Sequence, residues 1–183
     1  MKEEIILECI NLFNIEGCKF HLDDVAKNLK ISKKTIYKYF SSKEDILKTI
    51  VEESADAVKE RQIAIYNDNT LETKEKLFQI LTAKSKFENV LNLSKAFETE
   101  IYYPDVYTYF QKEFEKEWER AISLVQKGID EGTFKDMNID LIKNLLLNGM
   151  QMLYKGDILA RNHMTYHEAI IEIAKIVLEG ISK

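Results

Sequence analysis

Apolar residues recur along this chain with the spacing of amphipathic helices. Near the start, Ile5, Cys9 and Leu12 stand at positions i, i+4 and i+7, which places them on one helical face. The same period continues to the end of the chain, with a polar break at residues 68–70. The pattern predicts about nine helices, at about residues 2–16, 22–29, 33–39, 42–66, 71–90, 94–102, 104–131, 138–161 and 166–182.

Composition supports an all-α fold. Six glycines and one proline in 183 residues are far fewer turn-formers than the roughly 12% of an average protein. No run approaches the ~18 uncharged apolar residues of a membrane span, and the first residues include acids where a signal peptide would be basic and then apolar. Two cysteines are too few for a disulfide framework. We therefore expect an all-α cytoplasmic protein with no membrane partner.

Charge is distributed unevenly along the chain. The net charge is −5, yet residues 27–43 contain six lysines and no acid. A local basic stripe in an acidic protein is typical of a phosphate-binding surface. A run of charge is more often only a solvated face, so the stripe alone does not decide between the two.

Residues 22–40 predict a helix, a four-residue turn and a second helix, which is the helix-turn-helix arrangement. Ala26 is small enough for the two helices to cross closely, and Ile36 and Phe40 would anchor the second helix to the core. Two adjacent lysines, Lys33 and Lys34, begin that second helix and oppose its macrodipole. Phosphates lying opposite would offset this cost, so the second helix is predicted to enter the major groove of DNA.

The same segment resembles a known family. Thr35-Ile-Tyr-Lys-Tyr-Phe40, followed by Ser42-Lys-Glu-Asp-Ile-Leu47, is similar to the recognition helix and the next helix start of the tetracycline-repressor (TetR) family. The resemblance covers residues 5–47. It implies a helix-turn-helix DNA-binding domain at 1–47 and an effector-binding and dimerisation domain at 48–183. It also implies a homodimer that binds double-stranded operator DNA and is a repressor released by a small-molecule effector.

The resemblance assigns DNA contacts by position. These residues are His21, Lys33, Lys34, Thr35, Tyr37, Lys38, Tyr39 and Lys43. The hydroxyls of Tyr37 and Tyr39 and the ammonium of Lys43 are expected on phosphates, and Lys33, Lys34 and Thr35 on base edges. The chain departs from the family at His21, where a capping Thr is usual, and at Lys30, where a left-handed Gly is usual.

The last two helices are apolar on nearly all sides, so they need cover from both their own core and, we infer, a second copy. The expected dimer residues are Leu146, Gly149, Met150, Leu153, Ile170, Ile173 and Val177. A monomeric core with unusually deep burial is the alternative.

Aromatic residues concentrate in 97–118, where they are either core or the wall of a small apolar or aromatic effector site. The expected ligand-binding residues are Phe78, Phe97, Tyr103, Tyr107, Phe110, Phe114, Trp118 and Tyr154.

The sequence gives little support for catalysis, for a cofactor or for metal binding. The sequence has no phosphate loop, dinucleotide fingerprint or nucleophile elbow, so we expect neither an enzyme nor a cofactor. His163 and His167 have metal-like spacing but no third ligand nearby in sequence, so no metal is expected. One alternative function remains, a DNA-binding adaptor of the same fold whose C-terminal domain binds a protein partner.

Overall fold

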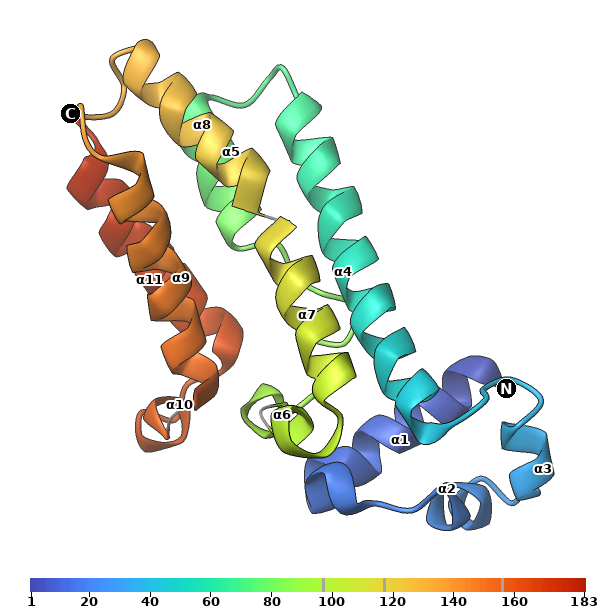
Figure 1. Ribbon diagram of the computed structural model, residues 1–183. Helices are drawn as coiled ribbons and strands as arrows, with labels where there is room; N and C mark the ends of the chain where they lie inside the picture. Colours follow the sequence, from blue (N-terminus) through green and yellow to red (C-terminus); the bar gives the residue numbers. More distant parts are fainter. Residues whose placement is uncertain (97, 117, 156) are drawn as a thin grey trace. The chain divides into compact units, whose positions relative to one another are not determined.

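The computed structural model describes residues 1–96, 98–116, 118–155 and 157–183, without the side chains of residues 94, 154 and 155. The described residues form α1 (Lys2–Glu16), the 3-10 turn η1 (Gly17–Lys19), α2 (Leu22–Asn28), α3 (Lys33–Ile36), α4 (Lys43–Asn67), α5 (Thr73–Leu81), the 3-10 turn η2 (Leu93–Lys95), α6 (Glu98–Tyr102), α7 (Pro104–Lys116), α8 (Trp118–Asp130), α9 (Ile139–Lys155), α10 (Ile158–Arg161) and α11 (Tyr166–Ile181), with no strand among them (Figure 1). The expected all-α fold is confirmed. Within these residues no helix is both long and apolar enough to cross a membrane.

Several helix ends lie where side-chain caps predict them. The Ser32 hydroxyl accepts a hydrogen bond from the Thr35 amide at the start of α3, and Thr165 and Glu168 form a complete capping box at the start of α11. At the start of α4, Ser42 forms only half of a capping box. The Ser42 hydroxyl accepts from the Asp45 amide (3.0 Å), but the Asp45 carboxylate accepts from Ser41 instead of closing back on Ser42.

The helix expected over 71–90 is wrong in its second half, because α5 ends at Leu81. Phe87, which follows in the non-helical stretch, is 2% exposed and belongs to a hydrophobic core with residues of α1. A continued helix would keep this side chain with α5. Tertiary burial of Phe87 therefore overrides the local helical pattern.

Contacts divide the chain into two compact units. Unit 1 consists of Met1–Ser54 and Phe87–Lys112, and unit 2 consists of Ala55–Lys86 and Glu113–Lys183. The continuous helix α4 runs from one unit into the other. These units follow spatial contacts, whereas the expected domains at 1–47 and 48–183 follow function, and that functional division stays a prediction.

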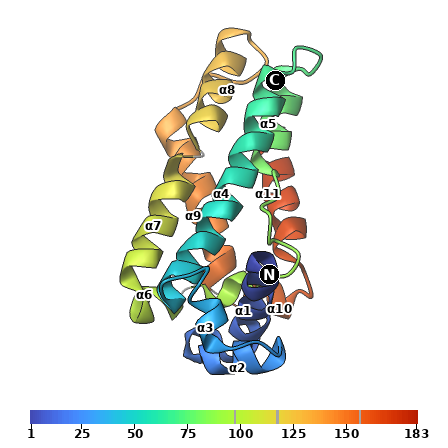
Figure 2. The same cartoon turned by 90° about the vertical axis from the view of Figure 1, so that its right-hand side faces the viewer.

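Unit 1 is built around α1. The inner face of this helix, which includes Ile5, Cys9 and Phe13, packs with Val25 of α2 and Ile36 of α3 in one core. Helices α2 and α3 lie beside α1 near the first turns of α4 (Figure 2). Two short helices without a core of their own are thus held by a longer one.

Unit 2 contains a second core, to which α5, α8, α9 and α11 contribute. Helix α5 contacts α8 and α11, and α9 contacts the same two helices. Phe134 is fully buried just after α8, against Gly128, where an added Cβ would overlap the Phe134 ring. Backbone hydrogen bonds from Lys135 to Ile181 and from Lys183 to Thr133 tie the end of the chain to this turn.

Candidate nucleic-acid interface

The turn between α2 and α3 is held by local hydrogen bonds. Lys30 has a left-handed conformation (φ 55°), and the Ile31 amide donates to the Ala26 carbonyl oxygen (2.9 Å). Ala26 itself is buried, as close crossing of the two helices requires. The Ser32 cap follows directly and starts α3. The chain thus changes direction within four residues, and α3 lies at an angle to α2 (Figure 1).

Burial of two side chains determines which residues of this segment point outward. Ile36 is fully buried and Phe40 is 3% exposed, both in the core of unit 1. Tyr37 and Tyr39 are consequently 50% and 46% exposed. Helix α3 ends at Ile36, and the chain continues as a turn through residues 37–39, where the sequence predicted further helix.

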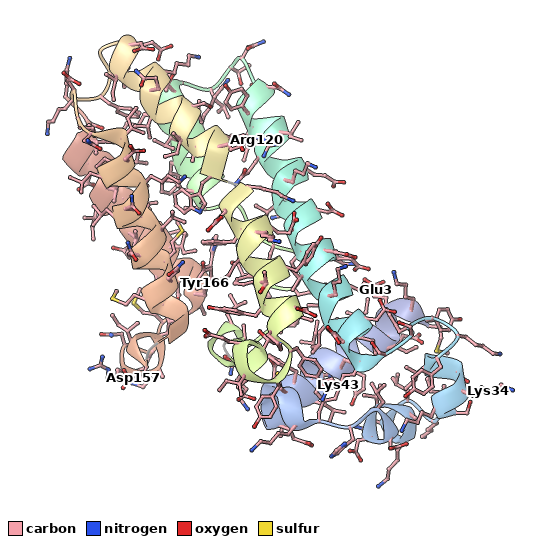
Figure 3. All side chains as sticks on the ribbon, in the orientation of Figure 1. Glu3, Lys34, Lys43, Arg120, Asp157 and Tyr166 are labelled. Carbon is pink, nitrogen blue, oxygen red and sulfur yellow. The ribbon has the colours of Figure 1, made fainter. Side chains whose placement is uncertain are left out.

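Five of the six lysines of the basic stripe are exposed. They are Lys27, Lys30, Lys33, Lys34 and Lys38. The Lys34 side chain extends away from α3 at the outer edge of unit 1 (Figure 3). The exposed lysines and tyrosines together combine positive charge with hydroxyl donors, which is the chemistry that binds a phosphate backbone.

Lys33 is exposed but paired. Its ammonium lies 2.9 Å from the Asp23 carboxylate of α2, and this hydrogen bond raises the pKa of Lys33. A base-edge contact by Lys33 would require the ion pair to open. Lys34, the next residue, therefore has the better geometry for such a contact.

Lys43, expected on a phosphate, is turned inward. Its ammonium donates to the carbonyl oxygens of Cys18 (2.7 Å) and Phe20, and lies 3.8 Å from the centroid of the Phe20 ring. Burial lowers the pKa of Lys43. In Figure 3 its label lies among the helices of unit 1, away from Lys34. The structure therefore brings Lys43 to the α1–α2 turn and not to the exposed lysines.

Two further expected contacts differ in their surroundings. His21 is the exposed N-cap residue of α2, and its side chain makes no capping hydrogen bond. The Thr35 hydroxyl lies 2.9 Å from the Ser32 hydroxyl, so it is engaged in the cap of α3. His21 is thus free of the capping role, while Thr35 shares its hydroxyl with the local structure.

The expected ligand residues are divided between the units. Tyr103, Tyr107 and Phe110 belong to unit 1, and Phe78, Phe114 and Trp118 to unit 2. Phe97 and the Tyr154 side chain lie outside the described residues. Within unit 2 the Phe114 and Trp118 rings meet edge to face, with centroids 6.2 Å apart.

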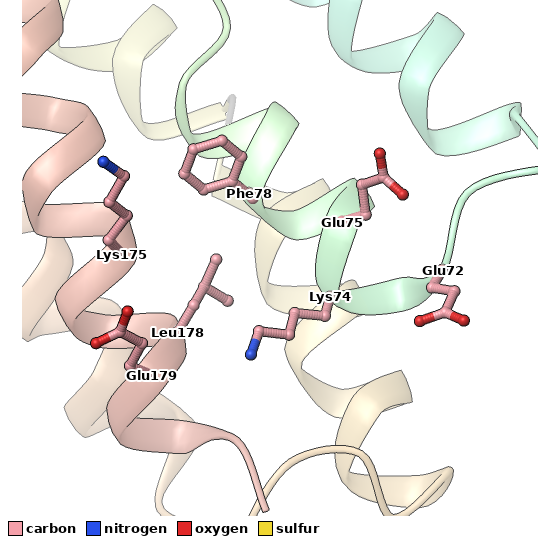
Figure 4. Close-up of a pocket in the computed structure, with 7 residues that line it drawn as sticks. All are labelled: Glu72, Lys74, Glu75, Phe78, Lys175, Leu178 and Glu179. Carbon is pink, nitrogen blue, oxygen red and sulfur yellow. The ribbon is translucent and has the colours of Figure 1, made fainter.

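One pocket of unit 2 involves an expected ligand residue. It is an open hollow of about 330 Å³ between α5 and α11, and Phe78 and Leu178 are its apolar lining residues (Figure 4). Its other lining residues are Glu72, Lys74, Glu75, Lys175 and Glu179. This mixed-charge lining differs from the expected aromatic wall, and the aromatic effector site stays a prediction.

The expected dimer residues lie largely inside unit 2. Four are almost fully buried in its core, namely Leu146, Met150, Leu153 and Ile170. Ile173 and Val177 are half-buried, and a Cβ added at Gly149 would lie 3.8 Å from Ile173.

The same two helices carry apolar side chains that the sequence analysis did not single out. They are Leu141, Leu145 and Met152 of α9 and Ile176 of α11, all 51–70% exposed, and we name them the outer apolar face. Helices that are apolar on nearly all sides give no periodic signal for which face meets their own core.

The sequence analysis also did not identify Asp23 as a residue of the basic surface, because its partner Lys33 lies ten residues away on another helix.

Comparisons with known proteins agree with this geometry. Residues 10–50 match the family model described as bacterial regulatory proteins, tetR family. The chain is 24% identical over 182 residues to the uncharacterized HTH-type transcriptional regulator YvaF of Bacillus subtilis (strain 168), covering 100% of this chain and 96% of that protein.

Two solved structures share the fold. The TetR family transcriptional regulator PfmR of Thermus thermophilus matches with a TM-score of 0.74 and 18% identity, over 98% of this chain and 99% of that one. The transcriptional regulator FadR of Bacillus subtilis, solved in complex with stearoyl-CoA, matches with a TM-score of 0.72 and 17% identity, over 99% and 100%. The matched segment contains the helix-turn-helix itself, so this part of the chain is similar to the DNA-binding segment of bacterial regulatory proteins of the tetR family.

Proposed function

We propose that this protein is a transcriptional repressor that binds operator DNA as a homodimer and is released by a small apolar or aromatic effector. The observation that carries the DNA-binding part is the exposed basic and aromatic surface of the helix-turn-helix. Lys34, Tyr37, Lys38 and Tyr39 project from a segment whose position is held by a buried Ile36. Such a surface suits phosphate contacts by several groups and base readout by few.

Dimerisation through α9 and α11 is supported by the outer apolar face. Helices α9 and α11 lie close together beside this face, because a Cβ added at Gly149 would be 3.8 Å from the Ile173 side chain. Exposed apolar surfaces of this kind mark protein interfaces. A second copy would bury the face by a two-fold arrangement, as is usual for homodimers.

The effector part is supported by aromatic residues in unit 2 and by one relative. FadR of Bacillus subtilis was solved with stearoyl-CoA, and the edge-to-face rings of Phe114 and Trp118 lie in the apolar core of unit 2, where Trp118 is 5% exposed. Trp118 is the chain's one tryptophan, so its fluorescence reports on this region. The relatives named above are regulators, and none favours the adaptor alternative.

Selection from a pool of random-sequence duplexes tests the DNA-binding proposal. Repeated capture by the wild-type protein should enrich a two-fold symmetric sequence, because each protomer of a dimer reads one half-site. Lys34→Ala should enrich a consensus with one less specified position in each half-site. A wild-type pool that remains random would contradict sequence-specific binding.

The effector proposal has a separate test with stearoyl-CoA as the probe. Stearoyl-CoA added to the complex of the protein with the selected duplex should change the fluorescence emission of Trp118 and release the DNA over the same range of stearoyl-CoA concentration. Free CoA is the control, because it carries the charged headgroup without the apolar chain. Release by both compounds, or by neither, would contradict an apolar effector of this class.

A further inference from the structure

The turn that joins α1 to α2 is held by side chains from distant parts of unit 1. The Cys18 amide donates to the Glu98 carboxylate of α6 (2.8 Å), and the Cys18 carbonyl oxygen accepts from the Lys43 ammonium of α4 (2.7 Å). Both polar groups of one peptide residue are therefore satisfied by charged side chains. Hydrogen bonds with a charged partner are stronger than neutral ones.

The segment that carries Glu98 also holds the end of α1. The Asn14 side chain donates to the Val90 carbonyl oxygen (2.6 Å) and accepts from the Asn92 amide (2.7 Å), while the Lys95 ammonium donates to the Ile15 carbonyl oxygen (2.7 Å). The last carbonyl groups of a helix lack partners within the helix. Lys95 supplies one such partner here, and Val90 and Asn92 bind the Asn14 side chain near the same helix end.

Gly17 shows how closely Glu98 approaches. It has a positive φ of 62°, and a Cβ added there would overlap the Glu98 carboxylate. The turn continues through Phe20, which is 1% exposed, to His21, the N-cap of α2. The position at which α2 begins is thus linked by three residues to the Glu98 contact.

We propose that Glu98 is a positioning residue for the DNA-binding helices, which acts by holding the Cys18 amide. Glu98 lies outside the expected DNA-binding domain and is not among the expected DNA contacts. Loss of its hydrogen bond frees the turn and loosens α2 and α3, although no residue of the exposed basic surface has changed. The effect on DNA binding rests on the proposed function, whereas the effect on the turn does not.

Thiol labelling of the whole protein tests the effect on the turn. Burial raises the pKa of Cys18 to about 11 and that of Cys9 to about 12, so at pH 8 both thiols are protonated and shielded. Glu98→Ala should accelerate maleimide labelling of Cys18 about 10-fold, the equivalent of ~1.4 kcal/mol. Cys9, buried in α1 of the same unit, should be unchanged. Peptide mass spectrometry separates the two sites.

Two further variants show whether faster Cys18 labelling comes from the lost hydrogen bond, from the lost charge or from general destabilisation of the protein. Glu98→Gln removes the charge but keeps an oxygen that accepts from the Cys18 amide, so it should label nearly as slowly as wild type. Glu100→Ala changes an exposed residue of the same helix and should have no effect. Equal labelling by the Ala and Gln variants at position 98, equal acceleration of Cys9 and Cys18, or no acceleration would each overturn the proposal.

DNA binding provides the second readout. Glu98→Ala should weaken binding to the duplex selected by the wild type about 10-fold, with an unchanged salt dependence because no phosphate contact is lost. Glu98→Gln should restore most of the affinity. Faster Cys18 labelling with unchanged affinity would reduce Glu98 to a merely structural residue and overturn the proposal. If the wild type selects no duplex, the proposed function fails while the labelling result still decides the role of Glu98 in the turn.

Discussion

Replacement of Lys43 by Ala distinguishes two roles for this side chain. Its ammonium donates to the Cys18 and Phe20 carbonyl oxygens and lies over the Phe20 ring. A hydrogen bond with a charged partner contributes roughly 1.5–3 kcal/mol. Because Lys43 is only part-buried, water replaces some of this contribution in the variant. We therefore expect a loss of about 2 kcal/mol of unfolding free energy, or about 4–8 °C in Tm for a chain of this length.

The assay combines thermal denaturation with salt titration of DNA binding. Lys43→Ala should lower Tm and leave the slope of log K against log salt unchanged, since an inward ammonium releases no counterions from DNA. Lys38→Ala is the matched control, because Lys38 is exposed. It should leave Tm unchanged and reduce the slope by about two in a dimer, one phosphate contact per protomer. If Lys43→Ala instead behaves like Lys38→Ala, the side chain works on phosphate and the reasoning from its inward position is refuted.

Three further predictions concern other parts of the chain. Lys34→Ala should weaken the binding free energy for the preferred duplex by roughly 1–3 kcal/mol and that for other duplexes by less, as measured by fluorescence anisotropy of labelled DNA. An equal loss of affinity for all duplexes would mean that Lys34 contacts a phosphate and not a base. Ile176→Glu should yield monomers in sedimentation experiments. The control Ile63→Glu also places a charge at an exposed apolar site and should leave the dimer intact. A dimeric Ile176→Glu variant would show that the interface lies elsewhere. The Thr73 hydroxyl bond lowers the pKa of Glu131, so its stabilisation is present above the ordinary Glu pKa and is lost as pH falls through the lower folded-state value. Thr73→Val should therefore lower Tm at pH 7 and lower it progressively less as the pH falls below the ordinary Glu pKa, and an equal loss at every pH would show that the carboxylate is not involved.

Features that depend on a few neighbouring residues can be predicted from sequence. The Ser32 cap, the Thr165 capping box and the left-handed Lys30 each depend on atoms within four residues, so the sequence contains all the participants. The buried anchors Ile36 and Phe40 follow from the same short period. The helix-turn-helix was accessible from sequence for this reason.

Features that depend on distant partners were not accessible. The direction of Lys43 is decided by carbonyl groups more than twenty residues earlier in the chain. The helix predicted over 71–90 stops because Phe87 is buried in the other unit's core. On α9, Leu145 and Leu146 are adjacent and equally apolar, yet only Leu145 is exposed. Which of two apolar neighbours is buried, and in which direction a side chain points, depends on tertiary packing, which composition and periodicity do not predict.

Hydroxyl-radical footprinting of the selected duplex tests the central claim most directly. Two recognition segments related by a two-fold axis should protect two backbone patches on one face of the duplex, centred about one helical turn, or a multiple of it, apart. Lys34→Ala should weaken both patches together. Protection of a single patch, or of the whole duplex without spacing, would contradict an operator-binding dimer that uses α2 and α3.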